Sequence, residues 1–394
     1  MKSDWQVKKL GDIVEFNPTE RLPKGAIAKK ISMDMLQPFT KDIFQYELQP
    51  YNGGAKFRNG DTIMARITPC LENGKVSKVN ILTKDEVGFG STEYIVLRAI
   101  PNVSDPDFIY YLTISDLVRA PAIKSMVGSS GRQRVQQNVL ETLELPIPPY
   151  DEQKKIAAIL SALDEKIAIN RAINDNLEQQ AQSYFQELFV DNADPEWAIG
   201  TISDLGTVVG GSTPSKAKPE YYTESGIAWI TPKDLSINKS KFVSHGENDI
   251  TELGLKNSSA AIMPEGTVLF SSRAPIGYIA IAAGEVTTNQ GFKSVVPKPE
   301  IGTPFVYFFL KNTLPVIEGM ASGSTFKEVS GSTMKNVPAV IPDAETLAKF
   351  SDFCAPIFAQ QRILEEQNQS LAMLRDNVLP KLMSGEIDVS DVQL

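Results

Sequence analysis

The chain has 394 residues, of which 42% are hydrophobic and 22% are charged, a composition typical of an ordinary globular protein of two to three domains. Cys70, Cys354 and His245 are its only cysteine and histidine residues, so neither a disulfide framework nor a zinc site is expected. It contains no run of roughly 18 apolar residues and does not open as a signal peptide, so we expect a cytoplasmic protein without a membrane partner. The net charge of −9 is unusual for a free-standing nucleic-acid binder.

The first predicted module, residues 1–150, consists mostly of short strands separated by Asn-Gly and Gly-rich turns, with helical pattern only near residues 106–125. A hairpin after Met64 is expected to present Arg66, Asn73 and Lys75 near a strand end or loop tip. A later Gly- and Ser-rich loop carries Arg132 and Arg134. Such side chains suit base edges and phosphates, although the spacing alone favours an ordinary solvated hairpin for the first three and fits a plain surface turn equally well for the loop.

A long helix is predicted over residues 151–190, because residues 151–189 contain no Gly or Pro and repeat apolar positions with a 4-3 spacing. A helix of that length extends about 58 Å. Asn170 and Asn174 lie on the apolar seam, where buried amides lower stability but fix the register of a coiled coil. The seam comprises Ile156, Leu160, Leu163, Ile167, Asn170, Asn174, Leu177, Ala181, Tyr184 and Leu188.

The second predicted module, residues 191–342, repeats the organisation of the first and again carries polar loops. Arg273 is its only arginine, so contacts to a nucleic acid would depend on Lys, Asn, Gln and Ser. Gln290, Lys293 and Lys327 are the candidates, since Gln can pair with adenine and Lys with guanine or phosphate. Ordinary turns remain the alternative for each loop taken singly.

A second long helix is predicted within residues 343–394, with Asn368 as a further candidate register residue. Pro356 removes a backbone donor, so we expect the helix to kink or restart there. Its seam matches the first at an offset of 194 residues, and the two helices are expected to pair as an antiparallel coiled coil. The seam comprises Leu347, Phe350, Cys354, Ile357, Gln361, Leu364, Asn368, Leu371, Val378 and Leu382.

The whole chain therefore divides into two similar halves. The segment from Trp5 returns from Trp197, and the stretch from Gly60 returns from Gly266, which pairs Arg66 with Arg273. Two long units fit a tandem duplication better than a solenoid of short repeats. The predicted fold is α/β (α+β), with two duplicated mixed α/β modules separated by the helix pair and related by a pseudo-twofold.

The sequence contains two partial matches to catalytic motifs, and each lacks a feature that the chemistry requires. Residues 147–150, Ile-Pro-Pro-Tyr, resemble the motif of adenine-N6 methyltransferases, but Ile147 replaces the required amide or carboxylate, and no Gly-rich loop for S-adenosylmethionine lies upstream. Asp61, Glu72 and Lys75 suggest a metal-dependent nuclease, yet Glu72 and Lys75 flank an Asn-Gly turn and should not project together from one strand. We expect no catalytic residues and no metal site in this chain.

Several stretches together resemble the specificity subunits of type I restriction-modification systems. They are ARITPCLENGKV with FGSTEYIVL, SGRQRV followed by LPIPPYDEQKKIAAILSALDEKI, SSRAPIGYIA with TTNQGFKSVVP, and SGSTFKEVSGSTMKNVPAVIP followed by a helix ending VLPKLMSGEI.

The resemblance implies two target recognition domains, each reading half of a bipartite asymmetric site in double-stranded DNA. It also implies that the helices act as a spacer and dock methyltransferase subunits, and that restriction and translocase subunits join the complex. S-adenosylmethionine, ATP and Mg²⁺ would then be bound by partner subunits, with no cofactor on this chain.

The charge distribution agrees with this interpretation, because the helical segments 151–190 and 343–394 carry −3 and −5 of the net charge of −9. Phosphate neutralisation would come from local patches or from partners. The alternatives are a single-chain DNA methyltransferase or nuclease, and a structural dimeriser that never contacts DNA.

Overall fold

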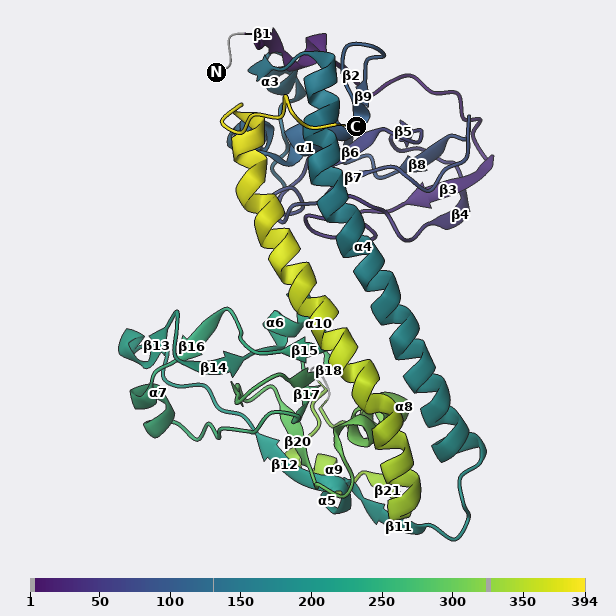
Figure 1. Cartoon of the computed structure of the whole chain (residues 1–394), viewed down its shortest axis with the longest axis vertical. Coiled ribbons are helices and arrows are strands. Elements are labelled where there is room, and N and C mark those ends of the chain that lie inside the picture. Colours follow the sequence, from purple (N-terminus) through teal and green to yellow (C-terminus); the bar gives the residue numbers. More distant parts are fainter. Residues whose placement is uncertain (1–3, 130, 324–326, 394) are drawn as a thin grey trace. The chain divides into compact units, whose positions relative to one another are not determined.

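The computed structural model describes residues 4–129, 131–323 and 327–393. The chain forms two compact units, Met1–Ala168 with Asn368–Leu394 and Ile169–Gln367. Each unit contains one globular module together with part of each long helix, and within each unit the two helices lie side by side (Figure 1). Among the helices of the described residues, none is both long and apolar enough to cross a membrane.

The first unit is built on three small sheets. Their orders are β2-β9-β6-β7, β4-β3-β8-β5 and β1-β10. The strands are β1 (Gln6–Lys9), β2 (Val14–Phe16), β3 (Ile27–Ile31), β4 (Glu47–Pro50), β5 (Lys56–Phe57), β6 (Thr62–Ala65), β7 (Val76–Lys78), β8 (Gly88–Gly90), β9 (Tyr94–Ala99) and β10 (Glu144–Ile147). The helices are α1 (Pro106–Ile114), α2 (Asp116–Lys124), α3 (Gln137–Glu141) and the 3-10 turn η1 (Leu10–Asp12).

The predicted helical stretch near residues 106–125 is confirmed as α1 and α2, whereas the short helix α3 was not predicted. Asp105 caps α1 by accepting hydrogen bonds from the amides of Asp107 and Phe108, and Pro106 occupies the first turn, where its missing donor costs nothing. The buried face of α1 joins the core that also contains Trp5 and, from the C-terminal helix, Leu382.

The second unit repeats this plan. Its sheets have the orders β12-β20-β17-β18-β15, β13-β16-β14-β19 and β11-β21. The strands are β11 (Ala198–Thr201), β12 (Gly206–Gly210), β13 (Tyr222–Thr223), β14 (Ile227–Ile230), β15 (Phe242–Val243), β16 (Asn248–Ile250), β17 (Val268–Ser272), β18 (Ile276–Ala282), β19 (Thr287–Thr288), β20 (Lys293–Pro297) and β21 (Pro338–Ile341). The helices are α5 (Ile202–Leu205), α6 (Pro232–Ile237), α7 (Glu252–Lys256), α8 (Thr303–Met320), α9 (Gly331–Lys335) and the 3-10 turn η3 (Pro219–Tyr221).

Corresponding strands pair in the same sense in both units, which confirms the predicted duplication. The β3–β8 pair of the first unit corresponds to the β14–β19 pair of the second. Both pairs are parallel, and each lies in a sheet whose other strand pairs are antiparallel. The β6–β7 hairpin corresponds to the β17–β18 hairpin, and β1–β10 corresponds to β11–β21. Both modules are therefore mixed α/β structures with a common set of paired strands, and they differ at the sheet edges, where β5 of the first and β13 and β15 of the second have no counterpart.

The two long helices are α4 (Tyr150–Gln186), which continues into a π-helical turn at Glu187–Asp191, and α10 (Ala344–Met383). The predicted restart at Pro356 is wrong, because α10 runs through it without interruption. Pro356 and Asp352, whose carbonyl loses its helical donor, are both exposed, so water can satisfy that carbonyl. Gly385 has φ +73, the left-handed conformation that commonly ends a helix.

The helices run antiparallel within each unit, as predicted. In the first unit the Asp164 carboxylate of α4 accepts a hydrogen bond from Arg375 of α10 at 2.7 Å. In the second, the side-chain amide of Asn174 donates to the carbonyl of Gln361 at 3.2 Å, and the side-chain amide of Gln361 donates to the carbonyl of Asn174 at 3.1 Å. Within the second unit, the contacts of Asn174 with Gln361 and of Tyr184 with Phe350 pair rising residue numbers on α4 with falling numbers on α10.

The three predicted register residues differ in burial. Asn170 is fully buried and donates to Gln367 at 3.4 Å, whereas Asn174 and Asn368 are both half-buried. The 4-3 spacing places a seam position at residue 375, between Leu371 and Val378. This position holds Arg375 and not an apolar residue. Arg375 is 6% exposed and contacts Asp164, which also accepts a hydrogen bond from Tyr111 at 2.6 Å.

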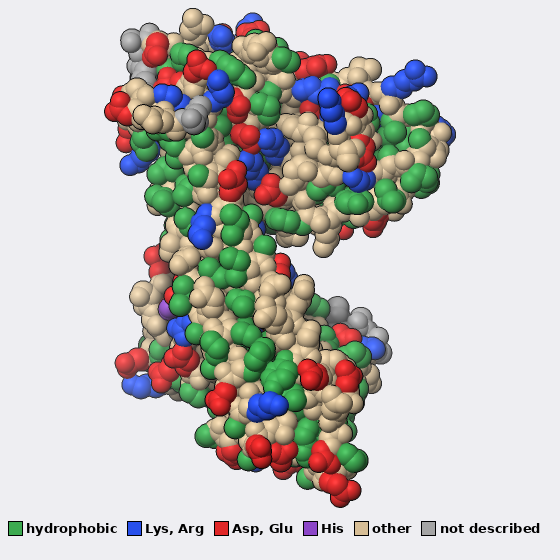
Figure 2. Space-filling model, turned by 45° about the vertical axis from the view of Figure 1, so that its right-hand side comes forward, with side chains coloured by type: hydrophobic (Ala, Val, Ile, Leu, Met, Phe, Trp, Pro, Cys, Tyr) green, Lys and Arg blue, Asp and Glu red, His purple; other side chains and the backbone are tan. Residues whose placement is uncertain are grey.

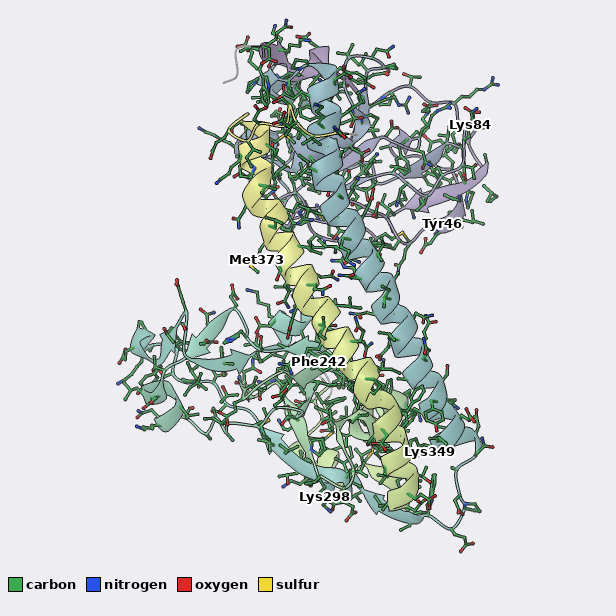
Figure 3. The ribbon with its side chains drawn as sticks, in the orientation of Figure 1. Tyr46, Lys84, Phe242, Lys298, Lys349 and Met373 are labelled. Atoms are coloured by element: carbon green, nitrogen blue, oxygen red, sulfur yellow. The ribbon has the colours of Figure 1, made fainter. Side chains whose placement is uncertain are left out.

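Each module contacts the helices through an equivalent lysine. The carbonyl of Lys41 accepts from Lys78 of β7, and the carbonyl of Lys241 accepts from Ile281 of β18, so the two lysines occupy matching places beside the matching hairpins. The Lys41 ammonium donates to Ser161 of α4 at 2.8 Å. Phe242, next to Lys241, packs against α10 (Figure 3).

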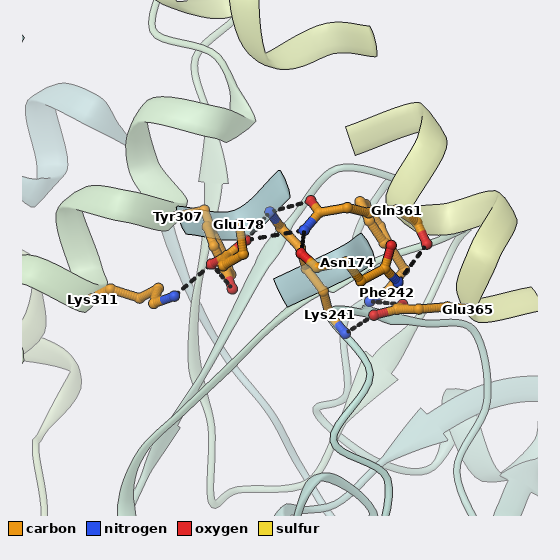
Figure 4. A network of polar contacts seen from close by, with 8 residues as sticks. All are labelled: Asn174, Glu178, Lys241, Phe242, Tyr307, Lys311, Gln361 and Glu365. Carbon is orange, nitrogen blue, oxygen red and sulfur yellow. Dashed lines mark hydrogen bonds and ion pairs between the residues drawn. The ribbon is translucent and has the colours of Figure 1, made fainter. Parts of the chain in front are cut away.

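Glu178 of α4 is the centre of a buried polar network in the second unit (Figure 4). Its carboxylate accepts hydrogen bonds from Lys241 at 2.8 Å, Lys311 at 2.5 Å, Tyr307 at 3.1 Å and Gln361 at 3.3 Å. Lys241 directly precedes β15, Tyr307 and Lys311 lie on α8, and Gln361 lies on α10. One carboxylate therefore connects the second module to both long helices.

The network continues through a second carboxylate. The Glu365 carboxylate of α10 accepts hydrogen bonds from the backbone amides of Lys241 and Phe242 at 2.7 and 3.0 Å. Glu365 therefore holds the chain at the start of β15. The Lys241 side chain is almost fully buried, and its nitrogen lies 3.4 Å from the centre of the Phe358 ring. A cation buried this deeply requires the opposite charge of Glu178.

The Glu178 network predicts a specific loss of stability in acid. Burial would raise the pKa of the Glu178 carboxyl, but the charges of Lys241 and Lys311 and their hydrogen bonds outweigh it and lower that pKa from 4.5 to about 2. Because the folded-state pKa lies below the unfolded value, the stabilisation is complete above pH 4.5 and is lost as the pH falls through about 2. Glu178→Gln should lower the free energy of unfolding by about 3 kcal/mol at pH 7, and the deficit should shrink by about 2 kcal/mol at pH 3.

Urea unfolding of both proteins at several pH values measures this difference. Asp175→Asn, which alters an exposed carboxylate of the same helix, is the control and should show a small deficit at every pH. A deficit for Glu178→Gln that stays constant between pH 7 and pH 3 would contradict the role assigned to the carboxylate charge.

Candidate functional site

The candidate site of the first module forms where three chain segments meet at the end of β6. The amide of Arg66 donates to the carbonyl of Glu93 at 2.9 Å, and the amide of Val135 donates to the carbonyl of Arg66 at 2.8 Å. These backbone bonds bring the loop that contains Arg132 and Arg134 beside the turn that precedes β9. We call the surface formed by Arg66, Glu93, Arg132 and Arg134 the first strand-end surface.

Arg134 makes the strongest contact on the first strand-end surface. Its Nε lies 2.9 and 3.0 Å from the two carboxylate oxygens of Glu93, and its Nη2 lies 2.6 Å from one of them. These hydrogen bonds, with the positive charge of Arg66, lower the pKa of Glu93, which stays ionised at neutral pH. The Nε of Arg66 is buried and has no hydrogen-bond acceptor among the described residues, while Arg132 is exposed.

The other two predicted residues of the first module lie on the connection between β6 and β7. Asn73 is exposed. Lys75 is half-buried, and its ammonium donates to the carbonyl of Met33 at 2.7 Å. Lys75 therefore holds this connection to a neighbouring loop.

The second module has a corresponding surface at the end of β17. The amide of Ser272 donates to the carbonyl of Gly291 at 2.7 Å, and the amide of Val329 donates to the carbonyl of Ser272 at 2.9 Å. We call the surface formed by Arg273, Lys293, Lys327 and Glu328 the second strand-end surface. Glu328 lies 3.5 Å from Arg273 and 4.0 Å from Lys293, while Lys327 is exposed.

The backbone bonds correct one predicted correspondence. Arg66 and Ser272 make the same two ladder contacts, so Arg66 corresponds to Ser272 and not to Arg273. Arg273 lies one residue further along, at the place of Ile67. Since successive strand residues point to opposite faces, a one-residue difference at a strand end aims the two arginines differently.

Gln290 lies on a neighbouring hollow of about 560 Å³, which is lined in addition by Asn289, Trp229, Lys216 and Lys233 among others. The side chain of Gln290 contacts the Thr213 hydroxyl, which fixes its orientation. The predicted loop that ends at Lys327 begins with Ser324–Phe326, which lie outside the described residues.

Charged side chains of both signs are mixed on the visible face of the molecule (Figure 2). On the face that Figure 2 shows, the Lys and Arg side chains of the described residues lie among Asp and Glu side chains and form no continuous basic stripe. Contacts to a polyanion would therefore depend on local groups such as the two strand-end surfaces.

The weak catalytic motifs have structural roles. Ile147 is the last residue of β10 and is 2% exposed in the core, so it cannot present a polar group to a substrate. Asp61 is buried and accepts two hydrogen bonds from Arg98, at 2.7 Å each, while Lys75 contacts Met33. Over residues 4–129, 131–323 and 327–393, no group of three or more His, Cys, Asp and Glu side chains is placed to hold a metal ion.

The fold and the two surfaces define a class of protein: a tandem duplication in which each module presents one cationic strand-end surface and is fixed to a shared pair of long helices. The family model for the type I restriction modification DNA specificity domain matches residues 2–179 and again residues 195–372. The chain belongs to this family of type I restriction-modification specificity subunits and contains two copies of the specificity domain.

Individual relatives agree with the family match. The MjaIX specificity subunit of Methanocaldococcus jannaschii is 39% identical over 194 residues, which span 47% of this chain and 45% of that protein. The HindI specificity subunit of Haemophilus influenzae is 24% identical over 98% of this chain and its own full length. The type I restriction-modification S subunit from M. genitalium shares the fold with a TM-score of 0.57, at 17% identity and 96% coverage of both chains.

The surroundings of Arg132 and Lys75 predict different effects of their removal. Arg132→Ala removes an exposed cation, so it should weaken DNA binding for all sequences and reduce the salt dependence by about one unit of slope. Lys75→Ala removes an internal hydrogen bond, so it should lower the free energy of unfolding by about 1 kcal/mol.

Salt titrations of DNA binding and urea unfolding separate the two effects. Lys84→Ala, which removes an exposed lysine from another loop of the same module (Figure 3), is the control and should preserve affinity. Equal losses of affinity for Arg132→Ala and Lys84→Ala would show that the first strand-end surface is not a preferred contact.

Proposed function

We propose that this chain is the DNA sequence-recognition subunit of a type I restriction-modification complex, and that each module reads one half of a bipartite asymmetric target in double-stranded DNA. The observation that carries the proposal is the duplicated strand-end surface, which occurs once in each copy of the specificity domain. Arginine can contact guanine with two hydrogen bonds, and Gln290 in the second module offers an amide suited to adenine.

The chain would be non-catalytic by itself. Methyltransferase subunits would bring S-adenosylmethionine and the methyl-transfer chemistry, and restriction and translocase subunits would bring ATP and Mg²⁺. This division of labour fits the buried, structural roles of Ile147 and Asp61. The complex would act in the cytoplasm, where the DNA and the partner subunits meet.

The long helices would serve as a spacer between the half-sites and as a docking surface for the methyltransferase subunits. This role is supported by the attachment of each module to both helices, through Lys41 and Arg375 in the first unit and through Glu178 in the second. A module fixed in this way cannot turn freely about the helix axes, so it would present its DNA surface in one orientation.

Module exchange tests the proposed division of the target. Replacing residues 1–150 by the corresponding module of another specificity subunit should change one half of the methylated motif and leave the other half intact. The donor should keep apolar side chains at core positions such as Trp5, because these share a core with Leu382 of α10. Mapping of methylated adenines in cells that carry the chain and its methyltransferase partner reads out the motif.

Each outcome of this exchange is informative. An assembled complex whose motif changes in both halves would contradict independent reading by the two modules. A chain that binds S-adenosylmethionine and methylates DNA without a partner would show the single-chain enzyme instead, and an assembled complex with no sequence preference would show a structural dimeriser.

Shortening of the helix pair tests the spacer role. Removing one heptad from α4 and the facing heptad from α10 should preserve the seam and shorten the helices by about 10 Å. That length corresponds to roughly three base pairs and to about a third of a turn of the duplex. We expect unchanged half-sequences with a shorter gap, or loss of methylation where the modules cannot follow the rotation.

The same methylation mapping measures the gap. Removing a heptad from α4 alone is the control, because it destroys the pairing of the seams and should prevent assembly. Unchanged half-sites at the original gap, from an assembled complex with both heptads removed, would show that another element sets the spacing.

A further inference from the structure

Arg134 and Glu93 form an arrangement that leaves a defined edge of the guanidinium free. An arginine has five N–H donors, and Glu93 engages the Nε and one donor of Nη2. The carbonyl of Arg132 takes one donor of Nη1, at 3.3 Å. Nη1 and Nη2 each keep one donor, and these two nitrogens form the end of the guanidinium that can make a two-bond contact to the O6 and N7 atoms of guanine.

Glu93 also changes what this arginine attracts. A free arginine on a DNA-facing surface binds phosphate as readily as a base, because phosphate is the stronger negative charge. With the Glu93 carboxylate 2.6 Å from Nη2, the net charge of the pair is near zero and an approaching phosphate is repelled by Glu93. The neutral acceptor edge of a base lacks this repulsion.

The second module contains the same combination of charges at different chain positions. Glu328 corresponds to Arg134, because each precedes the valine that donates to the strand end, and Gly291 corresponds to Glu93. The carboxylate has thus moved to the other segment, where it lies near two cations, Arg273 and Lys293. Both strand-end surfaces combine three cations with one carboxylate.

Fold stability does not account for this combination. Glu93 and Arg134 are 25% and 43% exposed, and Glu328 and Arg273 are 40% and 37% exposed, so each pair contributes little to folding. A carboxylate on a DNA-facing surface also weakens attraction to the phosphate backbone. Orientation of the cations for base contact is a benefit that offsets this weakening.

We propose that Glu93 and Glu328 are positioning residues for sequence recognition: each holds the neighbouring cation so that it contacts a base edge and not a phosphate, with Arg134 directed by Glu93 at a guanine of the first half-site. This inference rests on the proposed function of the strand-end surfaces.

Glu93→Gln tests the proposal in the assembled complex of this chain with its methyltransferase partner. Glutamine keeps the size of the side chain and one acceptor oxygen but removes the charge. Competition binding with duplexes that carry each single base-pair change should show a loss of discrimination of at least about fivefold at one G·C pair of the first half-site. Affinity for unrelated DNA should rise or stay constant, and methylation mapping should show relaxation at the same position.

Matched variants complete the test. Glu86→Gln breaks the Lys29–Glu86 ion pair, whose carboxylate has a similar exposure of 27%, and it should leave the motif unchanged. Glu328→Gln should relax only the second half-site. Should Glu93→Gln fail to assemble, Glu93→Asp keeps the charge but withdraws it by one methylene, and it should cause the same loss at one position.

Two results distinguish failure of this inference from failure of the proposed function. Loss of discrimination in Arg134→Ala together with full discrimination in Glu93→Gln would show that the arginine reads DNA without the carboxylate, which overturns the positioning role alone. Unchanged affinity and motif in Arg134→Ala would remove the first strand-end surface from DNA recognition, and the positioning role with it.

Discussion

The structure depends on covering the apolar stripe of each long helix. Neither stripe can remain in water, and within each unit it is buried against the other helix and against a module. In the first unit Leu160 of α4 and Leu382 of α10 share a core with the buried face of α1, and in the second unit Phe185 and Phe350 share a core with α8. Apolar burial supplies the stabilisation, but it does not specify which residues face each other.

Polar contacts supply that specification. A charged pair on an apolar seam can be satisfied in one alignment only, because sliding a helix by one turn leaves both charges buried without partners. Asp164 of α4 with Arg375 of α10 has this property, and Tyr111 of the first module also donates to Asp164. Glu178 of α4 contacts Gln361 of α10 and, in the second module, Lys241 and Lys311. The same side chains thus align the helices and orient the modules.

The sequence predicted the architecture well and the polar contacts poorly. Repetition and a 4-3 apolar spacing extend over many residues, so the duplication and both long helices were evident. Asp164 and Glu178 looked like solvent-facing residues because their partners are distant in sequence. Arg375 was detectable, since it occupies the seam position at which the apolar pattern fails.

For the strand-end surfaces too, the sequence predicted some of the residues but not their contacts. Arg66, Arg132 and Arg134 were selected as cations on turns, but nothing in the local sequence indicates that Glu93 would lie beside Arg134. The shift between Arg66 and Arg273 shows the same limit, since only the ladder bonds reveal which residue ends each strand. Contacts between distant segments require the folded backbone.

The division of the chain into units has a genetic consequence. The last turns of α10 and the segment after it belong to the first unit, where Leu379, Leu382, Met383 and Val389 share a core with Trp5. A stop codon or frameshift late in the gene would therefore damage the module encoded by its beginning, while the module encoded nearest the lesion would keep its own core. Recombination that shuffles the 5′ part of such genes can succeed only where the incoming segment is compatible with a 3′ end that it never replaces.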